Sequence, residues 1–556
     1  MPYYFKSFRS VKTIRLAMLA LIIFAATFNC LSAIQNGGFK NKRFKYVETR
    51  HGKVRGHSAG DGDYLAFLGI PYAAPPVGDN RFKGPKPPIP WEGIYDAIIT
   101  TKCPQKGEGD ENCLHLNVFT PITIPGTPLP ILVYIHGGSF IMGTAPTAGV
   151  EHLIKQNIIV VTINYRLGAL GFLCLGLPEA PGNAGLKDQV AALKYVQENI
   201  GHFGGDPKRV TVYGMSAGGA SVEYLILSKT STNLFHQAII ESASATSPWA
   251  LDRKPVATAH KVAELLDIPN TDFRQILVEH YKKVPSVALA EANFAYYNNL
   301  TDGTFGFVPC VESKNVSGQE PFMTKPPSEI LAKGDFRKMP TMFFFATLEG
   351  LYLRSAEYHE HHYKKRMESN FLDFLPADLD FHSDEVKKET ARIIKRFYFS
   401  NGIDKISYLN YFGDSLIMHG LLNSVEAHGR SFINLVYLME FGYKGNLGGY
   451  EEFYEPINVA GHGDVVKYAI LNKQPVSESD KLTVRRVTRL IANYVKYGNP
   501  TPAKTALLPL TWPPVHYKDN TCFYLGQEFE VYSEPLRVRK NFWDNVYAKA
   551  QKRGSH

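Results

Sequence analysis

A serine lies between two glycines in the run Gly214-Met215-Ser216-Ala217-Gly218, directly after an apolar stretch at 210–213. The pattern G-x-S-x-G, placed between a strand and a helix, is typical of a tight turn that exposes a serine hydroxyl for nucleophilic attack. The stretch at 210–213 is expected to be the strand, and 220–227 is compatible with a helix. Such short matches also occur by chance in Gly-rich turns, but strand, turn and helix together favour a nucleophilic role for Ser216.

A serine nucleophile requires hydrogen-bond donors for the oxygen that becomes negative in the tetrahedral intermediate. The run His-Gly-Gly-Ser-Phe at 136–140 follows a buried-looking strand at 131–135 and can supply them. We expect the backbone N–H groups of Gly138, Ser139 and Ala217 to form this oxyanion hole. A Gly-Gly pair is usually an ordinary turn, and its position after a strand, upstream of the serine, is what favours the catalytic interpretation.

The serine also requires a base, and the base requires a buried acceptor that fixes its tautomer. Most of the 18 histidines are expected to be surface or structural, but His462 lies in a loop of small residues at 460–464. Glu349 follows the aromatic run 343–345 and precedes Gly350, although a glutamate after a strand is ordinarily solvated. The order serine, acid, histidine is the one that α/β-hydrolases use. We therefore predict that Glu349 and His462 complete a catalytic triad.

Short apolar runs that alternate with helical segments must position these residues. The pattern predicts strands at 131–135, 158–163, 210–213, 238–241, 341–345 and 433–441, and helices at 186–200 and 480–497. This alternation predicts parallel βαβ units, and hence an α/β fold with a large, mostly parallel central sheet flanked by helices. The helix-rich segments between about 250 and 430 are expected to be cap insertions. Ser477 and Ser479 are candidate caps for the long helix at 480–497.

The composition is that of an ordinary globular protein, with 44% hydrophobic and 20% charged residues. The formal net charge of +9 is spread along the chain without a basic stripe or a nucleic-acid motif, which argues against a nucleic-acid partner. Basic residues precede an apolar run at 16–28, and small residues follow it, as in a secretory signal peptide. That run is shorter than the roughly 20 residues of a membrane-spanning helix. We predict a signal peptide at 1–33, a single domain at 34–556, secretion, and no stable membrane span.

Six cysteines are present, and Cys30 lies in the predicted leader, so the number that remains is odd and at least one stays unpaired. Cys103 and Cys113 bracket a short Gly-rich polar loop and form the most natural disulfide in an oxidising compartment. The sequence leaves open how the other three pair, namely Cys174, Cys310 and Cys522.

Two further patterns bear on modification and metals. Asn299 and Asn315 each begin an N-x-[ST] acceptor sequence for glycosylation. The run His-Glu-His-His at 359–362 lacks the HExxH spacing that puts two imidazoles on one helical face, so we interpret it as a polar surface segment. No metal site is predicted.

Ordered runs of residues extend over nearly the whole chain after the leader. They include Phe-Leu-Gly-Ile-Pro-Tyr-Ala at 67–73, Pro-Pro-Val-Gly at 75–78, Glu-Asn-Cys-Leu at 111–114, Asn-Tyr-Arg at 164–166, the serine turn extended to Gly219, and Gly-His-Gly-Asp at 461–464. In these runs the chain resembles the type-B carboxylesterase and cholinesterase-like family, and especially its insect carboxylesterases. The resemblance implies a single α/β-hydrolase domain, a gorge-like active site and a Cys103–Cys113 disulfide. Ser242 matches a serine that the family places near the triad.

The chain departs from the family pattern at three places. Met215 stands where cholinesterases and many relatives carry glutamate, and the loop between Cys103 and Cys113 is short and lacks tryptophan. Cholinesterases use an aromatic side chain in that loop to attract a quaternary ammonium group, so both features argue against choline esters. No cysteine pair follows within about fifty residues of Trp249, so the family's usual second disulfide is expected to be absent.

These residues together predict a serine carboxylesterase that acts on small-molecule esters through an acyl-enzyme intermediate, without a metal or cofactor. The natural ester is left open among xenobiotic, odorant or pheromone, hormone and dietary esters, and so is the oligomeric state. Phe140, Trp249 and the aromatic run 343–345 suit either an apolar substrate pocket or the core. The alternative is a catalytically silent adhesion or binding protein, because this family includes members that keep the fold and lose the triad.

Overall fold

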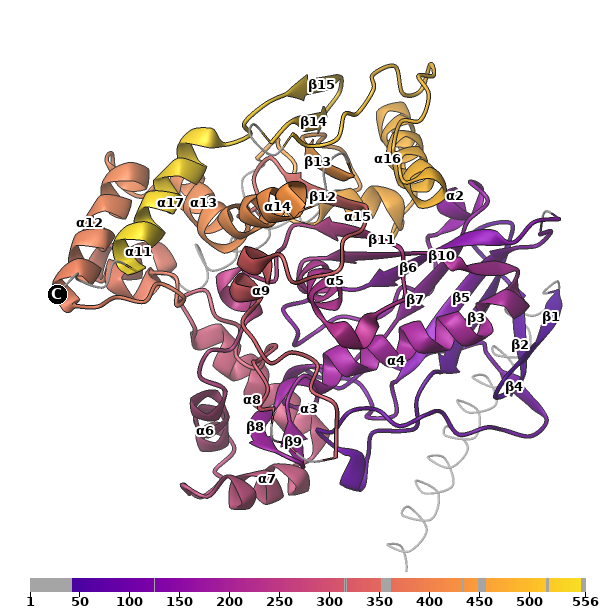
Figure 1. The fold of residues 1–556 in the computed structure, drawn as a ribbon, viewed down its shortest axis with the longest axis horizontal. Coiled ribbons are helices and arrows are strands. Elements are labelled where there is room, and N and C mark those ends of the chain that lie inside the picture. Colours follow the sequence, from indigo (N-terminus) through magenta and orange to yellow (C-terminus); the bar gives the residue numbers. More distant parts are fainter. Residues whose placement is uncertain are drawn as a thin grey trace, which may run out of the picture. The chain divides into compact units, whose positions relative to one another are not determined.

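A β-sheet of thirteen strands organises the described residues (Figure 1). The computed structural model describes residues 43–124, 126–314, 316, 318–351, 362–431, 435–448, 457–516 and 520–551. The chain divides into one unit that ends at Lys45 and one compact unit from Tyr46 onward. The predicted leader at 1–33, the acceptor Asn315 and positions 359–361 lie outside the described residues.

The sheet is parallel at its centre and has antiparallel pairs on both sides. Its strands are β1 (Phe44–Thr49), β2 (Gly52–Ser58), β3 (Tyr64–Pro71), β4 (Ile94–Asp96), β5 (His115–Pro121), β6 (Leu129–Ile135), β7 (Ile159–Ile163), β10 (Gly205–Met215), β11 (Gln237–Glu241), β12 (Thr341–Ala346), β13 (Val436–Phe441), β14 (Cys522–Leu525) and β15 (Phe529–Tyr532). The order is β1-β2-β3-β5-β7-β6-β10-β11-β12-β13-β14-β15, with β4 beside β2 and parallel to it. Neighbours from β7 to β13 are parallel, as the sequence predicted, and β14 also pairs with β13 in parallel. A separate pair consists of β8 (Cys174–Leu177) and β9 (Ala180–Pro181).

The central strands are buried on both faces, which explains why they appear in the sequence as continuous apolar runs. Every residue of β6, β7 and β12 is buried. One face packs against α4 (Ala184–Asn199) and α5 (Ala217–Leu227). The other face packs against α2 (Glu151–Ile154), α15 (Asp464–Ala469) and α16 (Glu478–Tyr497). In Figure 1, α4 and α16 accordingly lie on opposite sides of β6 and β10.

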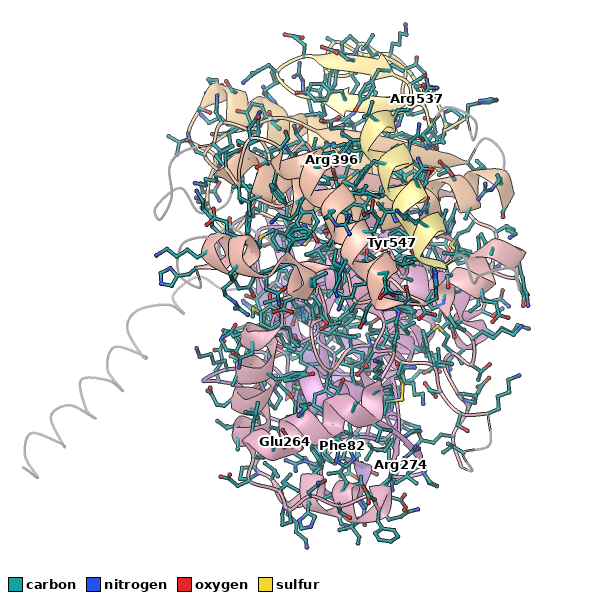
Figure 2. The ribbon with its side chains drawn as sticks, turned by 90° about the vertical axis from the view of Figure 1, so that its left-hand side faces the viewer. Phe82, Glu264, Arg274, Arg396, Arg537 and Tyr547 are labelled. Atoms are coloured by element: carbon teal, nitrogen blue, oxygen red, sulfur yellow. A yellow bond between two sulfur atoms is a disulfide. The ribbon has the colours of Figure 1, made fainter. Side chains whose placement is uncertain are left out.

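The remaining helices lie mostly between β11 and β13, where the sequence predicted helical insertions. They are α3 (Gly168–Phe172), α6 (Pro255–Leu265), α7 (Arg274–Lys283), α8 (Ser286–Asn299), α9 (Pro327–Lys333), α11 (Tyr363–Ser369), α12 (Asp384–Phe399), α13 (Lys405–Gly413), α14 (His419–Ser431) and α17 (Arg537–Gln551), with short turns η1 (Gly78–Asn80), η2 (Ile200–Phe203), η3 (Lys229–Ser231), η4 (Pro248–Ala250), η5 (Phe371–Phe374) and the π-helical η6 (Asp414–Met418). Figure 2 shows α12, which carries Arg396, beside α17, which carries Tyr547. Phe397 of α12 stacks on Phe542 of α17 with ring centroids 3.8 Å apart. Within the ranges described above, no helix combines the length and apolarity needed to cross a membrane.

Candidate active site

Ser216 occupies a strained turn between the parallel centre of the sheet and a buried helix. Strand β10 ends at Met215, α5 begins at Ala217, and Ser216 between them has φ 56° and ψ −125°. A non-glycine residue holds such a conformation only where its surroundings enforce it. The flanking glycines are required by close packing, because a Cβ on Gly214 would lie 2.1 Å from the carbonyl oxygen of Gly218.

The structure brings the three predicted triad residues together. His462 Nε2 lies 2.9 Å from Ser216 Oγ, and His462 Nδ1 lies 2.7 Å from Glu349 Oε2. When Nδ1 donates to the carboxylate, Nε2 is left as the acceptor for the serine hydroxyl, which is the tautomer that a general base needs. Glu349 is 2% exposed and Ser216 is 6% exposed, so the hydrogen-bonded path is shielded from water.

Two hydrogen-bond donors fix the carboxylate of Glu349 through Oε1, the oxygen that does not contact the imidazole. Oε1 accepts a hydrogen bond from the hydroxyl of Ser242 at 2.7 Å and another from the N–H of Ala346 at 2.7 Å. Ser242 follows the end of β11, and Ala346 ends β12, so two parallel strands position the acid. Oε2 is the oxygen that faces the imidazole.

The loop that carries His462 runs beside the segment that carries Glu349. Leu348 pairs with Gly461 in an isolated parallel bridge, and the N–H of His462 donates to the carbonyl of Leu351 at 3.1 Å. These main-chain contacts link residues on either side of Glu349 to Gly461 and to His462 itself. The acid and the base are therefore aligned by backbone as well as by side chains.

The predicted oxyanion loop lies against the serine turn. Gly138, Ser139 and Phe140 have φ of 107°, 56° and 61°, and the carbonyl of Gly138 accepts the N–H of Met142 at 3.0 Å. A Cβ on Gly137 would lie 3.0 Å from the Cβ of Ser216, so the loop passes next to the serine. Across the turn, Ala217 is the first residue of α5, where a helix supplies no acceptor for its own N–H groups.

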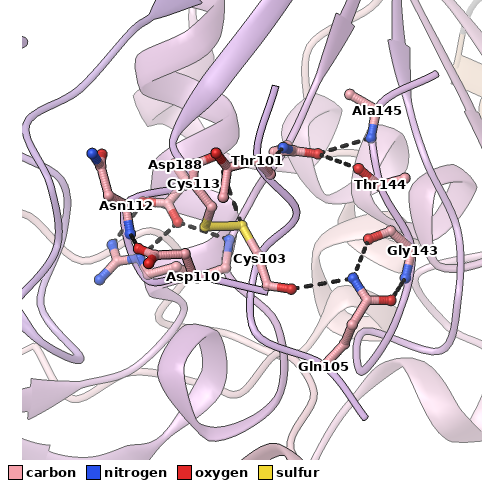
Figure 3. The surroundings of a disulfide bond; sticks show 12 residues. Thr101, Cys103, Gln105, Asp110, Asn112, Cys113, Gly143, Thr144, Ala145 and Asp188 are labelled. Carbon is pink, nitrogen blue, oxygen red and sulfur yellow. Dashed lines mark hydrogen bonds and ion pairs between the residues drawn. A yellow bond between two sulfur atoms is a disulfide. The ribbon is translucent and has the colours of Figure 1, made fainter. Parts of the chain in front are cut away.

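The Cys103–Cys113 disulfide loop supports the far end of the oxyanion loop (Figure 3). The side-chain amide of Gln105 donates to the carbonyl of Cys103 at 3.1 Å and to that of Gly143 at 2.9 Å. The N–H of Gly143 donates back to Gln105 Oε1 at 3.1 Å. Residues from the disulfide loop thus fix the chain shortly after the predicted oxyanion donors.

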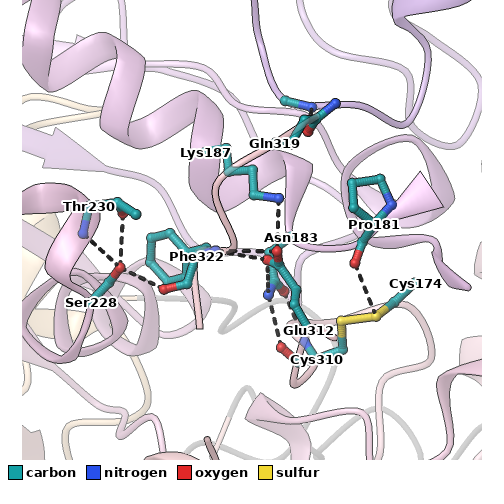
Figure 4. A network of polar contacts seen from close by, with 11 residues as sticks. Cys174, Pro181, Asn183, Lys187, Ser228, Thr230, Cys310, Glu312, Gln319 and Phe322 are labelled. Atoms are coloured by element: carbon teal, nitrogen blue, oxygen red, sulfur yellow. Dashed lines mark hydrogen bonds and ion pairs between the residues drawn. A yellow bond between two sulfur atoms is a disulfide. The ribbon is translucent and has the colours of Figure 1, made fainter. Parts of the chain in front are cut away.

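A second disulfide joins Cys174 to Cys310, which lie 136 residues apart in the sequence. The sequence left the pairing of Cys174 and Cys310 open, and this bond differs from the local disulfide after Trp249 that the sequence predicted to be absent. Figure 4 shows the surrounding network, in which Asn183 donates to the carbonyl of Cys310 at 2.8 Å and to Glu312 at 2.8 Å. Cys522 is free and buried, and burial raises the pKa of its thiol, which makes it unreactive.

Aromatic side chains flank the oxyanion loop. Trp249 stacks on Phe305 with centroids 5.1 Å apart and lies 6.3 Å from Phe140. Phe140, Trp249, Phe343 and Phe345 are all buried in the same core cluster. Of the aromatic residues in the sequence prediction, Phe140 belongs to the oxyanion loop and Trp249 lies next to it.

The other predicted sites fall on the surface or in the core. Asn299 is exposed at the end of α8. His136, which precedes the oxyanion loop, stacks on Tyr165 with centroids 4.5 Å apart, and burial lowers its pKa to about 4. His136 is therefore neutral near pH 7. In the part of the chain that the structure describes, no group of three or more His, Cys, Asp or Glu residues is arranged to hold a metal ion.

Comparison with known proteins places this geometry in a family. The model of the carboxylesterase family matches residues 43–543. Esterase FE4 of Myzus persicae is 33% identical over 508 residues, which cover 86% of this chain and 88% of that protein. Juvenile hormone esterase of Tribolium castaneum is 32% identical over 85% of this chain and 86% of that protein. The crystal structure of juvenile hormone esterase from Manduca sexta, with OTFP covalently attached, is 27% identical, has a TM-score of 0.80, and covers 91% of this chain and 100% of that one.

The chain belongs to the carboxylesterase family and has the α/β-hydrolase fold. It is a carboxylic ester hydrolase.

Proposed function

We propose that the protein hydrolyses carboxylic esters with Ser216 as the nucleophile, His462 as the general base and Glu349 as the acid that orients the base. The observation that carries this proposal is the continuous path from Ser216 Oγ through both ring nitrogens of His462 to Glu349 Oε2, at 2.9 Å and 2.7 Å. Such a path is the geometric requirement for a serine triad.

The reaction proceeds in two acyl transfers. Ser216 Oγ attacks the ester carbonyl while His462 takes the hydroxyl proton, and the N–H groups of Gly138, Ser139 and Ala217 stabilise the oxygen that becomes negative. The C–O bond to the alcohol then breaks, and the alcohol leaves with the proton from His462. Water attacks the acyl-enzyme with the same base, and the carboxylic acid and the free serine are released.

Phe140 and Trp249 are buried in the core next to the oxyanion loop, so they support that loop and do not select among esters. The relatives include proteins named juvenile hormone esterase, so a hormone ester is one of the natural substrates to be compared with xenobiotic, odorant or pheromone, and dietary esters. The small-molecule ester is the partner that this site requires.

We further propose that residues 1–33 are a signal peptide, that 34–556 form one catalytic domain, and that the protein is secreted. The two disulfides in the described residues support this, because disulfides persist in oxidising compartments. N-terminal sequencing of protein from the culture medium tests the leader, since cleavage requires a start near residue 34. Peptide mass spectrometry of the same protein tests for glycans on Asn299 and Asn315.

Replacement of the nucleophile tests the triad. We expect Ser216→Ala to lower kcat on p-nitrophenyl butyrate by at least about a thousandfold, because only binding and the oxyanion hole remain. Ser221→Ala is the matched control, since Ser221 lies on the same helix and its hydroxyl donates to the carbonyl of Ala217 without contacting the triad. Wild-type protein without ester turnover or an acylation burst would favour the silent binding protein instead.

A further inference from the structure

Glu241 is a buried carboxyl group that touches the segments of all three triad residues. It ends β11, is fully buried, and lies in register with Met215 of β10 and Phe344 of β12. Its backbone carbonyl accepts the N–H of Ser216 at 2.8 Å. The next residue in the chain is Ser242, which donates to Glu349. The main chain at this position therefore contacts the nucleophile and leads directly to the support of the acid.

The side chain of Glu241 reaches the segment of the base. Oε1 accepts the N–H of Val466 at 3.2 Å, and Val466 lies in the first turn of α15, directly after the loop of His462. Oε2 accepts the hydroxyl of Tyr213, which lies on β10 shortly before the nucleophile. Tyr213 is fully buried, and Val466 is 8% exposed.

We propose that Glu241 and Tyr213 are positioning residues that fix the His462 segment against the nucleophile turn. The inference rests on the proposed triad function. The first N–H groups of a helix lack acceptors within the helix, so the N–H of Val466 depends on the carboxyl group of Glu241. The hydroxyl of Tyr213 in turn holds that carboxyl group toward α15. A small displacement of a catalytic group can lower the reaction rate by a large factor. The hydrogen bond between Val466 and Glu241 therefore controls the distance and alignment between His462 Nε2 and the serine hydroxyl.

Several ionisable groups lie near the carboxyl group of Glu241 and influence its pKa. They are Tyr213 on β10, Tyr134 on β6, Glu349 after β12, and Asp464 at the start of α15. Burial raises the pKa of Glu241 to about 8, against the lowering effect of the hydrogen bonds from Tyr213 and Val466. At neutral pH the group is mostly protonated, and Glu349 is the acid that lies against the imidazole. A neutral amide in place of the carboxyl group should therefore preserve the arrangement.

Four variants test the inference by separating kcat from KM. We expect Glu241→Leu to lower kcat on p-nitrophenyl butyrate by about tenfold or more, and Tyr213→Phe to lower it about threefold to tenfold, with KM within about twofold. Glu241→Gln keeps an oxygen for the N–H of Val466, and its amide N–H can donate to the Tyr213 oxygen in place of the acid proton, so it should retain at least about half of the wild-type kcat. The matched control is Tyr494→Phe, because the Tyr494 hydroxyl is buried on the same face of the sheet and donates to Ala238 of β11, away from the triad.

The outcomes separate this inference from the proposed function. If Ser216→Ala is inactive and Tyr213→Phe has the same kcat as Tyr494→Phe, the triad stands and the positioning role is overturned. A loss in Glu241→Gln as large as in Glu241→Leu would also overturn it. If wild-type protein has no esterase activity, the proposed function itself fails. Thermal unfolding of each variant, and stoichiometric labelling of Ser216 by a fluorophosphonate, distinguish misplacement of the base from loss of the fold.

Discussion

The hydroxyl of Ser242 shows how one side chain can influence the base without touching it. It donates to Glu349 Oε1 at 2.7 Å, and the N–H of Ala346 donates to the same oxygen. The two bonds leave Oε2 free to accept from the imidazole. Ser242 also has φ of 56°, so its backbone is held in a conformation that few residues adopt. The serine therefore contributes both a donor and a fixed turn after β11.

We expect Ser242→Ala to lower kcat about threefold to tenfold with little change in KM. The lost hydrogen bond is worth about 1 kcal/mol, and the remaining bond from Ala346 keeps the carboxylate in place. Ser244→Ala is the control, because the Ser244 hydroxyl bonds to Thr246 and Ser424 instead of the acid. Equal kcat values for the two variants on p-nitrophenyl butyrate would show that Ser242 does not support the acid.

The two disulfides tie elements together over very different lengths of chain. Cys103 and Cys113 close a short loop, which the sequence shows directly, because the two cysteines are neighbours across a polar stretch. Cys174 and Cys310 lie before α4 and after α8, and only the folded insertion brings them together. Sequence reasoning could not find this pair, since nothing local to either cysteine specifies its partner. The same holds for the contact between Glu241 and Val466.

Loop length predicts which disulfide matters more for stability. Closing a loop of 136 residues rather than 10 should contribute about 2 kcal/mol more by chain entropy. We expect Cys174→Ala with Cys310→Ala to lower the free energy of unfolding by more than Cys103→Ala with Cys113→Ala, as measured by urea unfolding. All four cysteines are buried, so the cavity costs are matched. The short disulfide should instead affect kcat, through Gln105 and Gly143. The reverse ranking of stabilities would contradict the chain-entropy argument.

At the scale of the molecule, the parallel centre of the sheet and the order of the triad were accessible from sequence. Strands such as β6 and β12 are continuous apolar runs because helices cover both faces of the sheet. Such runs can be recognised in the sequence alone. The strands β14 and β15 and the final helix α17 were not predicted. Both strands have only four residues, whereas α17 buries Trp543, Val546 and Ala550 at helical spacing, a pattern that the sequence contained and the prediction missed. Glu241 carries no motif, so its role follows only from the fold.

Buried ionisable groups link the stability of the whole chain to pH. Burial lowers the pKa of His115 and His136 to about 4 and raises the pKa of Asp252 and Asp414 to about 6. The histidines make stability rise with pH up to about 6.5, because the unfolded chain binds protons that the folded chain excludes. The aspartates act in the opposite direction at lower pH. Above pH 6.5 the effect of these four groups fades, whereas Glu241, with a pKa of about 8, still holds its proton in the folded chain.

Between pH 6.5 and 8 the folded chain keeps the proton of Glu241 and the unfolded chain releases it, so stability falls as the pH rises. Relative to Glu241→Gln, which has no such proton, the free energy of unfolding of the wild type should fall by about 2 kcal/mol over this interval. Urea unfolding of both proteins at pH 6.5 and pH 8 measures the change, and subtraction cancels every other group that titrates. The same difference at both pH values would mean that Glu241 is already ionised at pH 6.5. In that case an anion, not a neutral acid, would hold α15 beside the catalytic histidine.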